Sequence, residues 1–215
     1  FFFFFLMIRR PPRSTLLPSR RSSDLAWKKY GKYVIAVAVV IVLATAGNTA
    51  WRHYQASQKA EMANRFDEAG DLARNGDVKG AIDQLSAMAK DGGGYGTLAR
   101  LQQASLMAEN GDNEGAVAVY DAVAADSSID PIYSELALVL SVMHQLDSGD
   151  PQTLLDRLAS QLKPEAPWRF TAYEMAAGLS IRKGDKEAAA DYLKKITDDA
   201  EAPQAARQRA SELLR

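Results

Sequence analysis

The amino-acid sequence predicts an all-α protein with one N-terminal transmembrane helix, an α-solenoid of about four helical hairpins behind it, and a C-terminal capping helix. Three observations predict this fold class. Residues 33–51 carry no charged side chain. Beyond them helix formers such as Ala, Leu, Glu and Arg dominate, and no stretch alternates β-branched and polar residues as a half-buried strand would. Gly-Asp pairs then recur at intervals of 35, 38 and 35 residues, which is the length of a helical hairpin.

The uncharged run Tyr33–Trp51 has the length and the borders of a membrane span. Its 19 residues would form a helix of roughly 28 Å, close to the ~30 Å hydrocarbon core of a bilayer. Tyr and Trp side chains border both ends, and three Lys residues crowd residues 26–32, the predicted cytosolic flank. The positive-inside rule then predicts a bacterial inner-membrane protein with a cytosolic N-terminus and a periplasmic C-terminal domain.

A cleaved signal peptide is the alternative interpretation of this region. Residues 28–32 would be its basic part, Val34–Leu43 its apolar core and Ala44–Ala46 its cleavage site. We favour a retained, single-pass anchor, because the uncharged run continues beyond Ala46 to a second aromatic border at Trp51, which a signal peptide does not need.

Two further segments differ in composition from the span. Residues 1–25 combine a Phe run with Arg, Ser and Pro and lack any helical or strand period. They resemble the translation of a sequencing-adapter read, so we treat them as a non-native, disordered segment.

Residues 52–215 are the predicted repeat domain, with 18 Lys and Arg against 26 Asp and Glu, a net charge of −8. Such a surface repels nucleic acid.

The four Gly-Asp pairs mark the turn inside each predicted hairpin. Glycine can take the left-handed conformation that ends a helix, and the aspartate can cap the next one. Small residues seven before and five after the glycine let two helices approach closely, and large apolar residues nine after it fill the space between hairpins. The pairs begin at Gly76, Gly111, Gly149 and Gly184, and these registers hold Ala69, Ala104, Val142 and Ala177, then Ala81, Ala116, Leu154 and Ala189, then Leu85, Tyr120, Leu158 and Leu193.

This pattern resembles the tetratricopeptide repeat, which has small residues where Ala104, Gly111 and Ala116 stand and a large one at Tyr120. The resemblance covers about residues 60–214. The early Trp and the closing Pro of that repeat are missing from their positions. Leu154 also stands where a small residue belongs, which puts the tight packing of the third hairpin in question. A last helix beginning at Pro203 would cover the open end of the solenoid.

An aromatic residue opens each of the later repeats, sixteen positions before the glycine: Tyr95, Tyr133 and Trp168. We interpret these side chains as wedges packed against the preceding hairpin, because buried aromatic residues mostly serve packing. A ligand-binding role is the alternative. The glycine-rich stretch at residues 92–96 lacks the Lys of a phosphate-binding loop, and we expect a flexible turn there.

The first helices of stacked hairpins line a concave face that can accept a helix or an extended segment of another protein. The alternative, which stays open, is that four repeats curve so little that several of these side chains belong to the core. The candidate partner-binding residues are Phe66, Leu98, Leu101, Val139, Met143, Glu174 and Ile181.

Catalytic chemistry has little support in the sequence. There is no Cys, and the two His residues, His53 and His144, lack an accompanying nucleophile spacing. Asp198, Asp199 and Glu201 do not follow the ligand spacing of a calcium loop. We therefore predict no enzyme, no metal site and no cofactor.

The order of these segments, with the stretch GGGYGTLARL and the later APWRF, resembles the YfgM-like family of ancillary subunits of the SecYEG translocon. The resemblance implies a scaffold whose span docks in the membrane beside the translocon while the repeats meet emerging exported chains or periplasmic chaperones. The alternative function is a cell-envelope or cell-division organiser that forms homo-oligomers through its repeats. No functional residue can be transferred from the family one by one.

Overall fold

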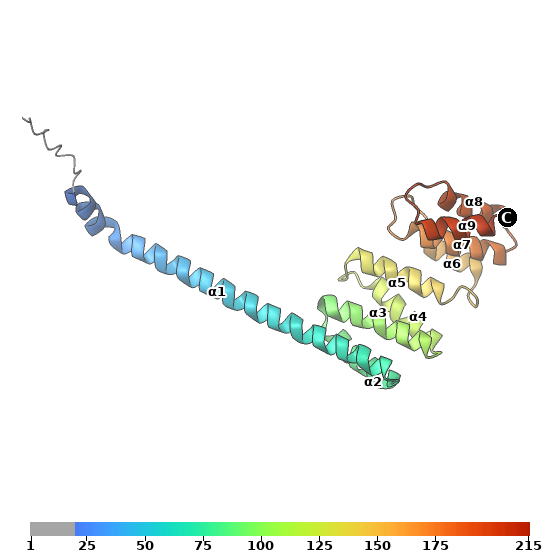
Figure 1. The fold of residues 1–215 in the computed structure, drawn as a ribbon, viewed down its shortest axis with the longest axis horizontal. Helices are drawn as coiled ribbons and strands as arrows, with labels where there is room; N and C mark the ends of the chain where they lie inside the picture. Colours follow the sequence, from blue (N-terminus) through green and yellow to red (C-terminus); the bar gives the residue numbers. More distant parts are fainter. Residues whose placement is uncertain (1–19) are drawn as a thin grey trace, which may run out of the picture. The chain divides into compact units, whose positions relative to one another are not determined.

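The computed structural model describes the backbone of residues 20–215 and the side chains from residue 28 onward. This part of the chain contains helices and no strand, which confirms the all-α prediction (Figure 1). The helices are α1 Arg20–Arg74, α2 Val78–Asp91, α3 Gly93–Glu109, α4 Asn113–Ala125, α5 Pro131–Met143, α6 Pro151–Leu158, α7 Arg169–Arg182, α8 Lys186–Thr197 and α9 Gln204–Leu213. Most of the predicted adapter-like segment lies outside the described residues, but its last six residues, from Arg20, are helical.

The chain divides into two compact units, residues 1–57 and residues 58–215, and each is described by itself. In the first unit α1 carries one stretch that is long and apolar enough to cross a membrane, and none of that stretch is buried. The hydroxyl of Thr45 donates to the carbonyls of Ile41 and Val42, each at 2.9 Å, and that of Thr49 donates to Thr45 at 2.8 Å. The helix therefore satisfies these polar groups itself, as a hydrocarbon environment requires.

The second unit is built of helical hairpins that follow one another along the chain. The end of α1, from Gln58, pairs with α2, α3 pairs with α4, α5 with α6 and α7 with α8, while α9 packs on α8 as the capping helix. The predicted arrangement of four hairpins and a cap is confirmed.

All twelve residues in the three registers around the Gly-Asp pairs are buried, none with more than 3% of its surface exposed. They belong to four successive apolar clusters. Each cluster joins the helices of one hairpin to the helix that follows, from α1–α2–α3 through α3–α4–α5 and α5–α6–α7 to α7–α8–α9. The core is therefore a chain of local clusters, which is typical of repeat proteins.

The third hairpin departs from the others because its second helix, α6, is short. Leu154, which stands in place of a small residue, is buried with 2% exposed. Gly149 compensates for its size, since a Cβ atom at this glycine would lie 2.9 Å from Leu154 Cδ1 and 3.1 Å from the Gln145 carbonyl oxygen. In this hairpin the small residue that allows the chain segments to pack closely is therefore Gly149, not the residue at position 154.

Candidate functional site

Because the two helices of a hairpin run in opposite directions, the turns inside the hairpins lie at one edge of the repeat unit and the loops between hairpins at the other. We call residues 75–77, 110–112, 144–150 and 183–185 the turn edge. We call residues 91–94, 126–130, 159–168 and 198–203 the loop edge.

Backbone groups at the turn edge are satisfied by the chain itself. Gly76, Gly111 and Gly184 have φ angles of 88°, 89° and 80°, the left-handed region that favours glycine. The amides of the aspartates that follow donate to the carbonyl of the residue five positions earlier, as when Asp112 N donates to Met107 O at 2.8 Å. Gly149 differs from the prediction, because α5 ends at Met143 and a longer turn, without a positive φ at the glycine, leads to α6.

The four aspartates of the turn edge cap the second helix of each hairpin. Their carboxylates accept from backbone amides three residues on, at distances of 2.8 to 3.0 Å. These donor–acceptor pairs satisfy the first amides of α2, α4, α6 and α8. The turn edge therefore satisfies the first amides of these four helices within the chain.

Ion pairs join the two helices of a hairpin near the loop edge. Arg65 contacts Asp91 at 2.9 Å, and Arg100 contacts Asp126 at 2.9 Å. Both pairs join residues 26 apart, at equivalent positions of the first two repeats. This register was not predicted, because the apolar and glycine positions of the repeats carry no sign of it.

Other hydrogen bonds join equivalent helices of neighbouring repeats. The Trp168 indole donates to the Ile132 carbonyl at 3.3 Å, 36 residues away, and the Arg182 guanidinium donates to the Leu146 carbonyl. Arg157 of α6 donates to Asp121 of α4, which also accepts from the buried Ser141 hydroxyl at 2.5 Å. These groups hold successive hairpins in register.

The candidate partner-binding residues do not form one continuous face. Val139 is a core residue with 2% exposed, so its assignment to the concave surface is wrong. Phe66 and Leu101 are half-buried against the first and second core clusters. Glu174 is held by Arg209 of α9 through a bidentate pair at 2.8 and 3.0 Å.

These four residues share one register, ten positions before the glycine, and that register faces the next helix of the stack. Phe66 lies 6.4 Å from the ring of Tyr95 in α3, and Val139 packs in the cluster that contains Ala172 of α7. Leu98, Met143 and Ile181 belong to other registers and are 36%, 41% and 51% exposed. They remain accessible to a partner.

The row of aromatic residues is also divided. Trp168 is half-buried against the third core cluster, where its indole bonds to α5. Tyr95 is half-buried beside Phe66. Tyr133, in contrast, is 38% exposed, and its role as a packing wedge stays a prediction.

Two cavities at the loop edge share the glycine run at residues 92–94 and Tyr133. The larger, with a volume of about 610 Å³, is called the glycine cavity; it is lined by Gln58, Lys59, Met62, Gly92, Gly93, Gly94, Tyr95, Leu98 and Tyr133. The smaller, of about 260 Å³, extends past the same glycines to Thr97, Arg100, Asp126, Ser128, Ile129 and Asp130. Most of the side chains around the larger cavity are apolar or aromatic, which is typical of a binding site for another molecule.

The carboxylates beside these cavities are already engaged. Asp126 accepts from the Ser128 hydroxyl at 2.6 Å and amide at 3.0 Å, and it pairs with Arg100. The Ser128 hydroxyl and the Arg100 guanidinium lower the pKa of Asp126 to about 2. Asp126 is therefore an anion at neutral pH. Asp130 caps α5 by accepting from the Ile132 amide at 3.1 Å.

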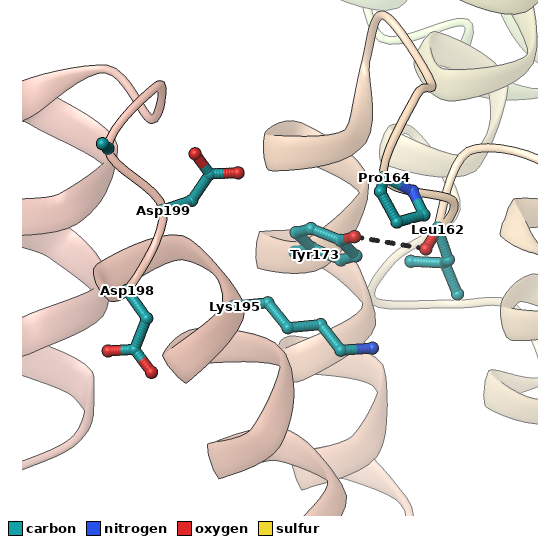
Figure 2. Close-up of a pocket in the computed structure, with 7 residues that line it drawn as sticks. Leu162, Pro164, Tyr173, Lys195, Asp198 and Asp199 are labelled. Atoms are coloured by element: carbon teal, nitrogen blue, oxygen red, sulfur yellow. Dashed lines mark hydrogen bonds between the residues drawn. The ribbon is translucent and has the colours of Figure 1, made fainter.

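A third cavity, of about 530 Å³, lies farther along the loop edge (Figure 2). Its lining includes Tyr173, whose hydroxyl donates to the Leu162 carbonyl at 3.2 Å. Lys195 Nζ lies over the rings of Tyr173 and Tyr192, 5.4 and 5.1 Å from their centroids. The chain's own cation therefore already contacts these aromatic faces.

The two histidines lie apart from these cavities. His144 stacks on the buried ring of Tyr120, with 5.6 Å between centroids and 11° between planes, so its role is packing. His53 lies on the exposed surface of α1 in the first unit. Burial raises the pKa of the Tyr120 hydroxyl.

A family model described as a tetratricopeptide repeat-like domain matches residues 26–189, which are 164 of the 215 residues. No curated protein and no solved structure matches the chain. The matched range includes the apolar stretch of α1 and the hairpins as far as the start of α8. The chain therefore belongs to the tetratricopeptide repeat-like domain family, whose fold serves typically as a non-enzymatic scaffold for protein–protein interaction.

Proposed function

We propose that this protein is a membrane-anchored scaffold that accompanies the protein-export translocon and links it to periplasmic chaperones. Tyr33–Trp51 would lie in the inner membrane with the N-terminus in the cytosol. The repeat unit would lie in the periplasm, where it meets emerging chains or chaperones. The observation that carries the proposal is that the apolar stretch of α1 has no buried part within the chain, so its whole surface is available to lipid and to another membrane helix.

The borders of the stretch support a position across the membrane. Lys29 and Lys32 lie over the rings of Tyr30 and Tyr33, at 5.4 and 5.1 Å, which places charge and aromatic groups together at one end. Trp51 lies beside Tyr54 at the other end, with 6.1 Å between ring centroids. Aromatic side chains of this kind are enriched at membrane–water interfaces.

Site-specific photocrosslinking in intact membranes tests this proposal. A photoreactive residue at Val39, Val40 or Ile41, positions about 100° apart around the exposed helix, would be activated by light in cells. We expect adducts with translocon subunits at one of these positions and weaker adducts at the others, because a helix contacts its neighbour with one face. Adducts with lipid only, or only with a second copy of the chain, would contradict the translocon role.

A second candidate function is a cell-envelope organiser that acts through self-association of its repeats. The end of the capping helix favours it, because Leu213 and Leu214 are 63% and 37% exposed and leave an apolar surface at the last repeat. If this function is correct, replacing Leu213 with Lys shifts the protein from oligomer to monomer in analytical ultracentrifugation. An unchanged sedimentation coefficient would contradict it.

A further inference from the structure

We propose that one face of α1 binds the phosphate of an anionic phospholipid head group where the apolar stretch ends. Thr49, Arg52, His53 and Ala56 line an open hollow of about 330 Å³ on this face. The inference rests on the proposed function in one respect, because it requires that Tyr33–Trp51 lies in a membrane. It depends neither on the translocon nor on the orientation of the chain.

The spacing of these four residues places them on the same side of the helix. They stand at positions i, i+3, i+4 and i+7, and such positions share one face of an α-helix. The hydroxyl of Thr49 already donates to the Thr45 carbonyl at 2.8 Å, so the N–H groups of Arg52 and His53 are the donors that the hollow offers. Arginine can form two parallel hydrogen bonds to a phosphate group, which makes phosphate a suitable ligand here.

The charge of Arg52 is not neutralised by the part of the helix around it. Residues 25–60 contain no Asp and no Glu. The next acidic residue is Glu61, nine positions beyond Arg52 and about 14 Å farther along the helix axis. The second unit, residues 58–215, contains 17 Lys and Arg against 26 Asp and Glu, a net charge of −9, and therefore repels anionic head groups. Attraction to such lipids has to come from the cations of the first unit.

The position of Arg52 along the helix would place its guanidinium at the depth of the lipid phosphates. It directly follows the apolar stretch, between Trp51 and Tyr54, whose rings lie 6.1 Å apart. Aromatic side chains of this kind lie at the level of the head groups. The orientation of the span gives no reason for an arginine here, because a cation beyond the span weakens the bias set by the three Lys residues at its other end. Binding of a head group supplies such a reason.

Photocrosslinking with a lipid probe in proteoliposomes of the full-length protein tests the proposal. The probe is phosphatidylglycerol with a photoactivatable group on its head group, and mass spectrometry of peptides locates the label. We expect label within residues 49–56. The variant R52Q/H53Q should reduce it about fivefold or more, because each basic residue near an anionic surface contributes roughly this factor. Label at residues 28–32, at the other end of the span, should stay unchanged and serves as the internal control.

The matched control variant is R52Q/S57R, which keeps the net charge but moves the guanidinium about 140° around the helix axis. Arg52 and Ser57 are both exposed, so neither replacement disturbs the fold. This variant should also lose most of the label at residues 49–56. Wild-type labelling of R52Q/S57R would overturn the proposal, because net charge alone would then attract the lipid.

Two further arms test the chemistry of the ligand. Equal labelling by a phosphatidylcholine probe of the same design would overturn the proposal, because the site would then not recognise an anionic lipid. Loss of the label on adding excess glycerol phosphate would overturn it as well, since the site would then take soluble phosphate compounds. We expect neither result.

The same labelling separates this inference from the proposed function. Label at residues 28–32 but not at residues 49–56 overturns the phospholipid site alone. Absence of label from the whole of α1 overturns the membrane anchor, and the site with it. Label at residues 49–56 that depends on Arg52, together with no translocon adducts in cells, supports the site and overturns the translocon role.

Discussion

The turn edge and the start of α3 at the loop edge differ in how they use glycine and aspartate. At the turn edge, Gly111 supplies a left-handed backbone and Asp112 caps the helix that follows, so both residues act on their own chain. At the loop edge, Gly94 occupies an ordinary helical position with open space around it, and no aspartate caps α3.

This difference indicates where the repeat unit can interact with other molecules. An edge whose helix-start amides are paired within the chain contributes to the free energy of unfolding and offers few backbone donors to a partner. An edge with uncapped amides, exposed aromatic rings and cavities contributes less to stability and keeps groups available. Four sets of substitutions, ordered by the size of their expected effects, test this contrast.

Replacing Gly149 with Val should lower the free energy of unfolding by about 2–3 kcal/mol, because its Cβ would overlap Leu154 and the Gln145 carbonyl. Urea denaturation of the full-length protein in detergent, followed by circular dichroism, measures this. The double variant G149V/L154A provides the control. If the overlap is the cause, adding G149V to L154A costs much less than adding it to the wild type.

Replacing Trp168 with Ala should lower the free energy of unfolding by about 2 kcal/mol, below the range for a fully buried Trp, because the ring is half-buried. The loss comes from its contacts with the third core cluster and its bond to the Ile132 carbonyl. Tyr133→Ala, in the same register but exposed, should cost less than about 0.5 kcal/mol. Equal losses from the two variants in the same denaturation experiment would mean that exposure does not separate these aromatic residues.

Replacing glycine with alanine should have opposite signs at the two edges. Gly111→Ala should lower the free energy of unfolding by about 1 kcal/mol, because φ is 89° there. Gly94→Ala should raise it by about 0.5 kcal/mol, because alanine is the better helix former. Melting temperatures of the two variants in the same detergent would show the two signs. A loss at both positions would remove the contrast between the edges.

The smallest effect concerns pH. The pKa of Asp126 is lowered to about 2 in the folded protein and is near 4 in an unfolded chain. A folded pKa below the unfolded one stabilises the protein above pH 4, and this contribution is lost as pH falls from about 4 to about 2. Ser128→Ala removes the first cause of the shift, so NMR titration should find a higher pKa for Asp126. Ser134→Ala, whose hydroxyl donates to the Pro131 carbonyl, should leave it unchanged.

Much of the fold could be predicted from the sequence because its signals are local. The period of the Gly-Asp pairs gave the hairpins, and the residues seven before, five after and nine after each glycine are all buried. Burial could be predicted at these positions because each of them contacts the equivalent neighbour in every repeat. Gly149 is the exception, because the turn before it is longer. A glycine is needed there to leave space for the Leu154 side chain, not to allow a left-handed backbone.

The accessible surface could be predicted only in part. A repeat register shows that Phe66, Leu101, Val139 and Glu174 are equivalent, but not which way their shared face points. That direction depends on how each helix is rotated about its axis relative to the next. In this structure the rotation directs the four side chains toward the following helix. The two ion pairs 26 residues apart could have been found by extending the search to charged residues. The cavities arise from loops with no common pattern, so no register marks them.

The hydrogen bonds between neighbouring repeats have a consequence for how the chain folds. Those that join Trp168 to Ile132, Arg182 to Leu146 and Arg209 to Glu174 span 36, 36 and 35 residues. The second unit therefore has a low contact order, and topologies of this kind fold quickly. Each hairpin can pack as soon as the next helix has been synthesised, so the repeat unit can fold one repeat at a time from its N-terminal end.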